Sequence, residues 1–316
     1  MQLIVAQVVA DAVQQRVAEL GLPVEIVVAG DDGQMTGEVH DAAAYFRAFM
    51  SGAGYARVLA TAPQLRWIHT ASAGVDGLLT DDLRQRGITL TNSAGVHAIP
   101  IAEWVLHALL MIVKRGRELI AAQAEQRWSD ESFDELGGKT LLVYGAGGIG
   151  AEIARRAAAF DMQLWGVNRS GRAVPHFDRV VRDAEWRSLL PQADYLVLAA
   201  PYTPATHHVI AAETLRQLPA HAWLINVARG GLVDEPALIE ALTAGTLAGA
   251  ALDTFEQEPL PRTSTLWMFP NVLISPHRSG SSPRSNDRVV DCFIANLQRF
   301  VAGDELHNIV DQEAGY

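Results

Sequence analysis

The sequence predicts an α/β protein made of two doubly wound lobes, each built around a parallel sheet. Three observations support this class. Strand-like and helix-like segments alternate through the first hundred residues, a glycine-rich turn follows an apolar run near the middle, and a second series of short apolar runs comes after it. Such alternation is typical of parallel sheets. At 316 residues the chain is long for one core, so two domains are expected.

The first lobe is predicted from short apolar runs separated by one clear amphipathic segment. The amphipathic segment predicts a helix from Asp11 to Leu20. Strands are expected at 3–6, 24–28, 57–60 and 66–70.

The second lobe begins after a long helical pattern from Ile101 to about Ala122. A further helix is expected from Ile149 to Phe160. Strands of this lobe are expected at 140–145, 163–168, 194–199, 223–227, 247–252 and 271–275. The last helix, 285–301, has no strand after it, so we expect it to return to the first lobe and close it.

Composition excludes several classes of protein. The formal net charge is -11, with a pI near 5.3, and no basic cluster suggests a nucleic-acid face. The single cysteine, Cys292, rules out an intramolecular disulfide and a cysteine-rich metal site, so no metal is expected. The N-terminus lacks the basic region of a signal peptide. The apolar stretch 99–113 contains Glu103 and His107 and is too short and polar to span a bilayer. We therefore expect a cytoplasmic protein with no membrane or nucleic-acid partner.

The glycine-rich turn reads G-x-G-x-x-G between a predicted strand and a predicted helix, which is the order of a dinucleotide site. Gly145 allows the tight turn, Gly147 lets the backbone approach a pyrophosphate, and Gly150 lets helix and strand pack closely. The helix N-terminus supplies N–H groups and a positive dipole end. The alternative is a glycine-rich turn with no ligand. The cofactor residues expected here are Gly145, Ala146, Gly147, Gly148, Ile149 and Gly150.

The residues after the second strand of this lobe bear on cofactor choice. An NAD site usually has Asp or Glu there, for the ribose hydroxyl. This chain instead has Asn168, Arg169, Ser170 and Arg172. Arginine can fork onto the extra phosphate of NADP, whereas a carboxylate would repel it. We therefore predict NADP(H) over NAD(H). In the alternative, the arginines are solvated loop charges and Asn168 bonds the ribose of NAD.

Three downstream segments place an arginine, a carboxylate and a histidine after successive predicted strands. They are Arg229, Glu258 and His277. Ligand-facing residues of open α/β sheets lie at the carboxyl ends of strands, so these three are expected to converge. Arginine offers a fork for a substrate carboxylate or carbonyl, histidine exchanges a proton near neutral pH, and a carboxylate orients that histidine. These types suit hydride transfer to a 2-keto acid.

Each of the three residues also has an ordinary structural interpretation. Arg229 could be a surface residue that forms an ion pair. Glu258, before Pro259, could be a loop carboxylate, and His277, after Pro276, could be a structural turn histidine. Their joint placement after successive strands favours the functional interpretation.

Four segments together make the chain resemble the D-isomer-specific 2-hydroxyacid dehydrogenases. They are G-A-G-G-I-G at 145–150, N-V-A-R-G-G-L-V-D-E at 226–235, D-T-F-E-Q-E-P-L-P at 253–261 and L-W-M-F-P-N-V-L-I-S-P-H at 266–277. The resemblance covers nearly all of the sequence. It implies a Rossmann cofactor domain, 99–282, inserted into a flavodoxin-like substrate domain formed by 1–98 and 283–316.

The resemblance also implies roles for particular residues. Arg229 would bind and polarise the keto acid, and His277 would be the acid/base, paired with Glu258. The loop 72–76 would hold the substrate carboxylate on its backbone N–H groups, although a plain strand-to-helix turn explains it equally. The substrate-binding residues of that loop would be Ala73, Gly74 and Val75. The remaining cofactor residues would be Pro201, Thr206, Val227, Ala228 and Asp253, with Asp253 on the nicotinamide side.

Two features separate the chain from much of the family. In lacking the acidic residue, the chain resembles the glyoxylate and hydroxypyruvate reductases that use NADPH. Arg278 stands where the family commonly has an apolar residue. The intact Glu258 argues against formate oxidation. The alternatives are a non-catalytic dinucleotide-sensing protein like the corepressors of this fold, and a phosphite-type dehydrogenase. The resemblance further implies a homodimer formed through the segment 101–128, unless that helix packs only within its own lobe.

Overall fold

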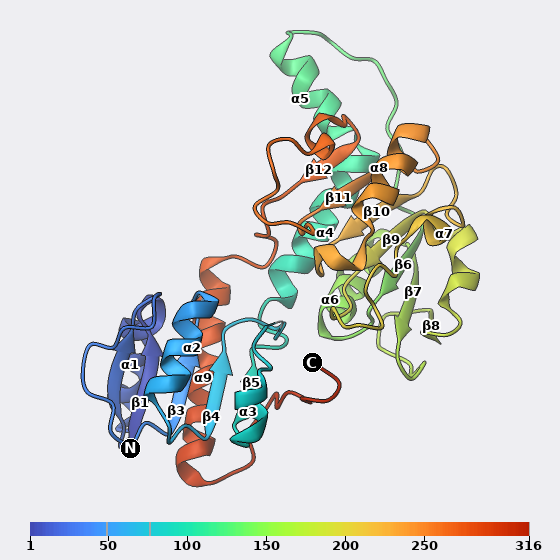
Figure 1. The fold of residues 1–316 in the computed structure, drawn as a ribbon. Helices are drawn as coiled ribbons and strands as arrows, with labels where there is room; N and C mark the ends of the chain where they lie inside the picture. The colour runs from blue at the N-terminus through green and yellow to red at the C-terminus, as the bar shows by residue number, and fades with distance from the viewer. Residues whose placement is uncertain (49, 76, 316) are drawn as a thin grey trace. The chain divides into compact units, whose positions relative to one another are not determined.

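The computed structural model describes residues 1–48, 50–75 and 77–315, and the chain divides into two compact units. One unit comprises Met1–His97 with Ser282–Tyr316, and the other comprises Ala98–Ser281. Each unit contains one parallel sheet with helices on both faces (Figure 1). The predicted class, two doubly wound parallel-sheet lobes, is confirmed.

The sheet of the first unit has the strand order β2-β1-β3-β4-β5, which is the flavodoxin-like order. Its strands are β1 Gln2–Ala6, β2 Glu25–Ala29, β3 Ala44–Arg47, β4 Trp67–Thr70 and β5 Thr89–Asn92. Apolar residues of α1 and α9 pack on one face, and those of α2 and α3 on the other. These helices are α1 Ala10–Leu20, α2 Gly52–Thr61, α3 Asp81–Gln85 and α9 Pro283–Ala302.

The sheet of the second unit has the order β12-β11-β10-β9-β6-β7-β8, so the chain reverses direction across the sheet between β6 and β9. Ligands of such sheets bind at the carboxyl ends of the strands beside this switch point. The strands are β6 Thr140–Tyr144, β7 Gln163–Asn168, β8 Arg179–Arg182, β9 Tyr195–Leu198, β10 Trp223–Asn226, β11 Gly249–Leu252 and β12 Val272–Ile274. The α-helices are α4 Ala98–Val113, α5 Gly116–Ala124, α6 Gly148–Ala157, α7 Ala212–Leu215 and α8 Glu235–Ala244.

Short 3-10 turns complete the two units. They are η1 Gln7–Val9, η2 Ala158–Phe160, η3 Trp186–Gln192, η4 Gly230–Leu232 and η5 Thr265–Met268.

The strand expected at 57–60 is wrong, because this segment lies inside α2. Ser51 caps the helix by accepting a hydrogen bond from Gly54 N, 3.1 Å away. Tyr55, Val58 and Leu59 are buried at helical spacing, so the tertiary core selects a helix where the four-residue run alone suggested a strand.

The long helix expected from Ile101 to Ala122 is two helices, α4 and α5. Arg115 between them has a φ of 51°, which breaks the helical path. Gly116, the first residue of α5, follows this break and lies close to the side chain of Met111.

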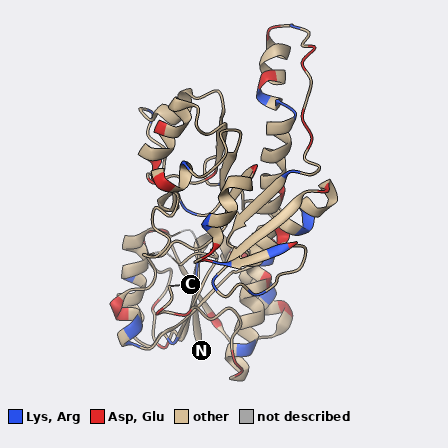
Figure 2. Cartoon of the chain, turned by 90° about the vertical axis from the view of Figure 1, so that its right-hand side faces the viewer, with Lys and Arg blue, Asp and Glu red and all other residues tan. Residues whose placement is uncertain are grey.

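Charged residues lie mainly on the helices and loops of the protein (Figure 2). Among the described residues, no helix combines the length and apolar character needed to cross a bilayer.

A histidine in β4, His69, is fully buried in an aromatic cluster of the first unit. Its ring centroid lies 5.4 Å from that of Phe46 and 5.6 Å from that of Phe293 of α9. The rings of Phe293 and Trp67 are stacked 5.4 Å apart. Burial lowers the pKa of His69 from 6.5 to about 3, because the charged imidazolium loses its hydration there.

This burial predicts an acid-sensitive first unit. Below pH 6.5 the unfolded chain protonates His69 and the folded chain does not, so stability falls as the pH drops towards 3. Replacing His69 by Asn removes that proton uptake. The free energy of unfolding of the variant, from urea titrations between about pH 6 and pH 4, should depend less on pH by about 1.4 kcal/mol per unit. The exposed His40→Asn serves as the control, and an equal change in that variant would contradict the assignment.

Candidate active site

The glycine turn after β6 is shaped by close backbone approach. Gly145 has a φ of 113°, and a Cβ there would lie 2.4 Å from Ala200 N. A Cβ on Gly150 would lie 2.3 Å from Gly145 O, so helix α6 packs against the turn itself. In contrast, a Cβ on Gly147 or Gly148 would meet nothing within 4 Å.

The start of α6 leaves room and donors for an anion. The first intrahelical bond of the turn runs from Ala151 N to Gly147 O, 2.8 Å long. The N–H groups of Gly148, Ile149 and Gly150 therefore belong to the first helical turn, where backbone donors have no intrahelical partner. Open space beside free N–H groups at a helix N-terminus fits the pyrophosphate of a dinucleotide.

The loop after β7 is organised by Asn168. Its Oδ1 accepts from Gly171 N at 2.7 Å and from Ser170 N at 3.2 Å, and its Nδ2 donates to Arg172 O at 2.8 Å. The amide of Asn168 is thus engaged within the loop. Arg169, Ser170 and Arg172 are exposed around it.

The loop after β9 holds Pro201 and Thr206 together. Thr206 Oγ1 donates to Pro201 O at 2.8 Å and accepts from Thr203 N at 2.8 Å. Thr206 therefore fixes the shape of this loop, and Pro201 is exposed on it.

The turn after β10 carries Arg229 and is held by Asn226, a residue whose role the sequence motif does not reveal. Asn226, 1% exposed, donates from Nδ2 to Arg229 O at 3.0 Å and accepts from Ala228 N at 3.0 Å. Val227 and Ala228 are buried beside it. A Cβ on Gly230 would lie 1.8 Å from the carbonyl carbon of Phe255, so this turn presses against the loop that follows β11.

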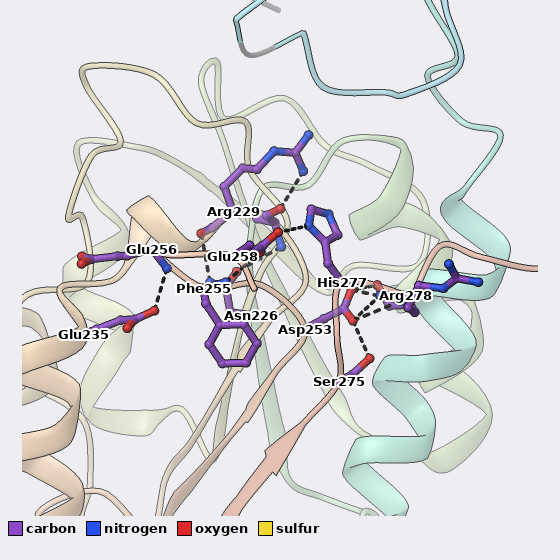
Figure 3. A network of polar contacts seen from close by, with 12 residues as sticks. Asn226, Arg229, Glu235, Asp253, Phe255, Glu256, Glu258, Ser275, His277 and Arg278 are labelled. Atoms are coloured by element: carbon purple, nitrogen blue, oxygen red, sulfur yellow. Dashed lines mark hydrogen bonds and ion pairs between the residues drawn. The ribbon is translucent and has the colours of Figure 1, made fainter. Parts of the chain in front are cut away.

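His277 and Glu258 form the central pair of the site. Nδ1 of His277 lies 2.8 Å from Oε2 of Glu258, and Phe255 N donates to Oε1 of the same carboxylate at 3.0 Å. A carboxylate only accepts, so Nδ1 carries hydrogen and Nε2 is left as the nitrogen that exchanges a proton. Figure 3 shows this contact between Glu258 and His277, with Arg229 in the same close-up. A guanidinium nitrogen of Arg229 donates to Ala228 O at 2.8 Å. The convergence of Arg229 with the pair stays a prediction.

The carboxylate of Asp253 anchors the loop on which His277 stands. It is 1% exposed. Its Oδ1 accepts from Ser275 Oγ at 2.6 Å and from Arg278 N at 2.8 Å, and its Oδ2 accepts from Ser279 N at 3.0 Å and also from Ser279 Oγ. His277 N donates to Asp253 O at 2.8 Å, and His277 has a φ of 52° (Figure 3). Asp253 therefore holds the backbone on both sides of His277 through hydrogen bonds to Ser275, Arg278 and Ser279. Its contact with a cofactor stays a prediction.

The loop that carries Glu258 has a second carboxylate beneath it. Glu256 N donates to Oε1 of Glu235, at the start of α8, at 2.6 Å. Burial raises the pKa of Glu235, and the neighbouring Glu256 and Glu258 raise it further. His208 Nε2 lies 2.7 Å from Glu256 Oε1 and ties this loop to the one after β9.

In the first unit, the loop after β4 presents three consecutive backbone donors. The N–H groups of Ala73, Gly74 and Val75 donate to no described residue. Successive unpaired N–H groups form an anion-binding concavity. Asp76, the last residue of the predicted loop, lies outside the described residues.

A glycine turn suited to a dinucleotide, together with a histidine–carboxylate pair and an arginine on other loops of the same sheet, is typical of a nicotinamide-dependent dehydrogenase. Comparison with known proteins agrees. The family model described as D-isomer specific 2-hydroxyacid dehydrogenase, NAD binding domain, matches residues 106–279. The chain belongs to the D-isomer specific 2-hydroxyacid dehydrogenase family, and is an oxidoreductase of the hydroxyacid dehydrogenase type.

Individual relatives cover most of the chain. A glyoxylate reductase of Korarchaeum cryptofilum is 33% identical over 264 residues, which are 82% of this chain and 80% of the relative. The structure of a D-isomer specific 2-hydroxyacid dehydrogenase from Xanthobacter autotrophicus Py2, in complex with NADPH and MES, has a TM-score of 0.87 at 29% identity and covers 100% of this chain and 99% of that one. An NADPH-dependent glyoxylate/hydroxypyruvate reductase from Sinorhizobium meliloti, with NADP and sulfate, has a TM-score of 0.86 at 27% identity and covers 100% and 99%.

The hydrogen bonds between Asp253 and the loop around His277 lead to a prediction for a variant of Asp253. Replacing it by Asn keeps the shape but removes the charge and one acceptor oxygen. Loss of charge-assisted hydrogen bonds, each worth about 1.5–3 kcal/mol, should lower kcat roughly 10- to 100-fold through a misplaced histidine. Steady-state kinetics measures the change in kcat, and cofactor titration measures any change in the cofactor Kd.

Ser275→Ala, which deletes a single donor to the same carboxylate, is the matched control and should cost less. Unchanged kcat with a large rise in the cofactor Kd of Asp253→Asn would instead show that Asp253 acts on the cofactor.

Proposed function

We propose that the protein reduces small 2-keto acids to D-2-hydroxy acids with NADPH, in the manner of a glyoxylate or hydroxypyruvate reductase. The observation that carries this proposal is the contact between His277 Nδ1 and Glu258 Oε2, which lie 2.8 Å apart. The relatives named glyoxylate reductase and glyoxylate/hydroxypyruvate reductase support the substrate class.

His277 is the proposed acid/base. With Nδ1 fixed on Glu258, a protonated ring presents Nε2–H, which gives its proton to the substrate oxygen as that oxygen gains negative charge. Glu258 keeps the ring in place through its contact with Nδ1. In the oxidation direction, Nε2 of the neutral ring accepts the proton of the hydroxyl. The nicotinamide cofactor, when bound, supplies the hydride.

Arg229 and the first-unit loop are the proposed substrate binders. The planar guanidinium of Arg229 suits a bidentate contact with carboxylate and carbonyl oxygens. The N–H groups of Ala73, Gly74 and Val75 supply further donors for the carboxylate. The carboxylate and the carbonyl occur in every 2-keto acid, so each of these groups suits the whole substrate class.

Removal of His277 tests the mechanism. Because the proton donor is lost, His277→Ala should lower kcat for glyoxylate or hydroxypyruvate by roughly 100-fold or more, measured as loss of nicotinamide absorbance. The exposed His40→Ala is the control and should keep wild-type turnover. Near-normal turnover of His277→Ala would rule out this assignment.

We propose NADPH as the preferred cofactor. The amide of Asn168 is engaged within its own loop by bonds of 2.7 and 2.8 Å, which counts against its holding the ribose of NAD. The exposed Arg169 and Arg172 follow the same strand and suit a phosphate. Two structural neighbours that contain NADPH and NADP support the same choice.

Substitution of the two arginines tests cofactor choice. The double variant Arg169→Ala with Arg172→Ala should raise KM for NADPH about tenfold or more, since each charged contact is worth roughly 1.5–3 kcal/mol, and leave KM for NADH unchanged. The control is Arg16→Ala on α1, in the other unit. Wild-type catalytic efficiency with NADH equal to or above that with NADPH would contradict the proposal.

We further propose a homodimer formed through the α4–α5 segment and the chain up to Trp128. Large apolar side chains are exposed there: Ile120 is 62% exposed and Trp128 is 88% exposed. Burial of such a surface favours self-association. Sedimentation at micromolar concentration should give twice the 34.2 kDa mass of the chain, and a monomer would contradict this proposal.

A further inference from the structure

A buried chain of hydrogen bonds in the first unit ends at the junction between β4 and the loop that follows it. Trp67 Nε1 donates to Thr91 Oγ1 at 2.8 Å, and the same oxygen lies 2.8 Å from His69 Nδ1. On the other side of the ring, His69 Nε2 lies 3.1 Å from Ser93 Oγ, which donates to Thr70 O at 3.0 Å. All five of these residues are fully buried.

The donor and acceptor of each hydrogen bond in this series are fixed by one another. The Ser93 hydroxyl gives its hydrogen to a carbonyl, so toward His69 it accepts, and Nε2 must carry the hydrogen. A neutral ring then has a bare Nδ1, which accepts the hydroxyl hydrogen of Thr91. The oxygen of Thr91 in turn accepts from the indole of Trp67, which only donates. One tautomer of His69 satisfies every group.

The carbonyl groups of the loop are fixed beside this chain. Ser93 N donates to Ser72 O at 3.1 Å, Asn92 Nδ2 donates to Ala73 O at 2.7 Å, and Ser72 Oγ donates to Gly74 O at 2.7 Å. In a planar trans peptide, the N–H points opposite to the C=O of the preceding residue. Each of the three carbonyls is thus held by a donor, and the N–H group that follows it, of residue 73, 74 or 75, points away from that donor.

We propose that His69, Asn92 and Ser93 are positioning residues that orient the N–H groups of 73–75 for the carboxylate of the 2-keto acid. The Nε2–H of His69 fixes the hydroxyl of Ser93, and Ser93 with Asn92 fixes the peptide groups of the loop. This inference rests on the proposed function, which assigns the substrate carboxylate to this loop.

Replacing His69 by Gln or by Asn distinguishes a positioning role of His69 from a role in packing alone. In His69→Gln the side-chain nitrogen reaches the place of Nε2 and still donates to Ser93, whereas in His69→Asn it stops near the place of Nδ1. The Asn variant should raise KM for the keto acid about tenfold, the effect of one hydrogen bond, with kcat and KM for NADPH unchanged. The Gln variant should restore KM. Ser93→Ala deletes the same link with a smaller change of volume and should reproduce the Asn variant.

A second measurement does not depend on turnover. In protein labelled with nitrogen-15 histidine, the resonances lost in His69→Gln identify the ring, and they should show hydrogen on Nε2 and none on Nδ1. Hydrogen on Nδ1 overturns the inference, as does an unchanged keto-acid KM in folded His69→Asn and Ser93→Ala. Failure of the proposed function shows differently, as wild-type protein that turns over no keto acid while the histidine spectra still report the tautomer.

Discussion

The buried carboxylate of Asp253 is the interaction on which the rest of the site depends. A charge at 1% exposure is tolerated only when it is fully hydrogen-bonded, and its donors come from the residues around His277. Satisfying that charge draws the loop after β12 into one conformation, with His277 at a φ of 52°. The histidine then meets Glu258, whose other oxygen is held by Phe255 N.

The same local device recurs at the ends of three strands. Asn92, Asn168 and Asn226 end β5, β7 and β10, and each side-chain oxygen accepts an N–H two residues ahead in the chain. Each side-chain nitrogen donates to a loop carbonyl, within 3.0 Å. The loops that contain Ala73, Arg172 and Arg229 are thus each held by one amide, which satisfies backbone groups that a loop otherwise leaves to water.

Where the sequence predicted elements well, the local pattern and the tertiary core favour the same structure. Leu3 to Ala6 is a continuous apolar run and forms a central strand, and the helix from Asp11 to Leu20 has one buried stripe. The segment 57–60 reads as a strand by itself, yet Tyr55, Val58 and Leu59 bury as one face of a helix. Strand β5, Thr89–Asn92, is short and has a single apolar residue, Leu90, and it forms by pairing with β4.

The sequence by itself determined the family, the glycine turn, the trio of Arg229, Glu258 and His277, and the absence of an acidic residue after β7, because these reside in residue types at fixed spacing. Only the tertiary structure decided that Asp253 holds the histidine loop and that the ring of His69 lies between Thr91 and Ser93. Both outcomes depend on which donors are left without water when strands far apart in sequence pack together, and spacing along one chain does not contain that information.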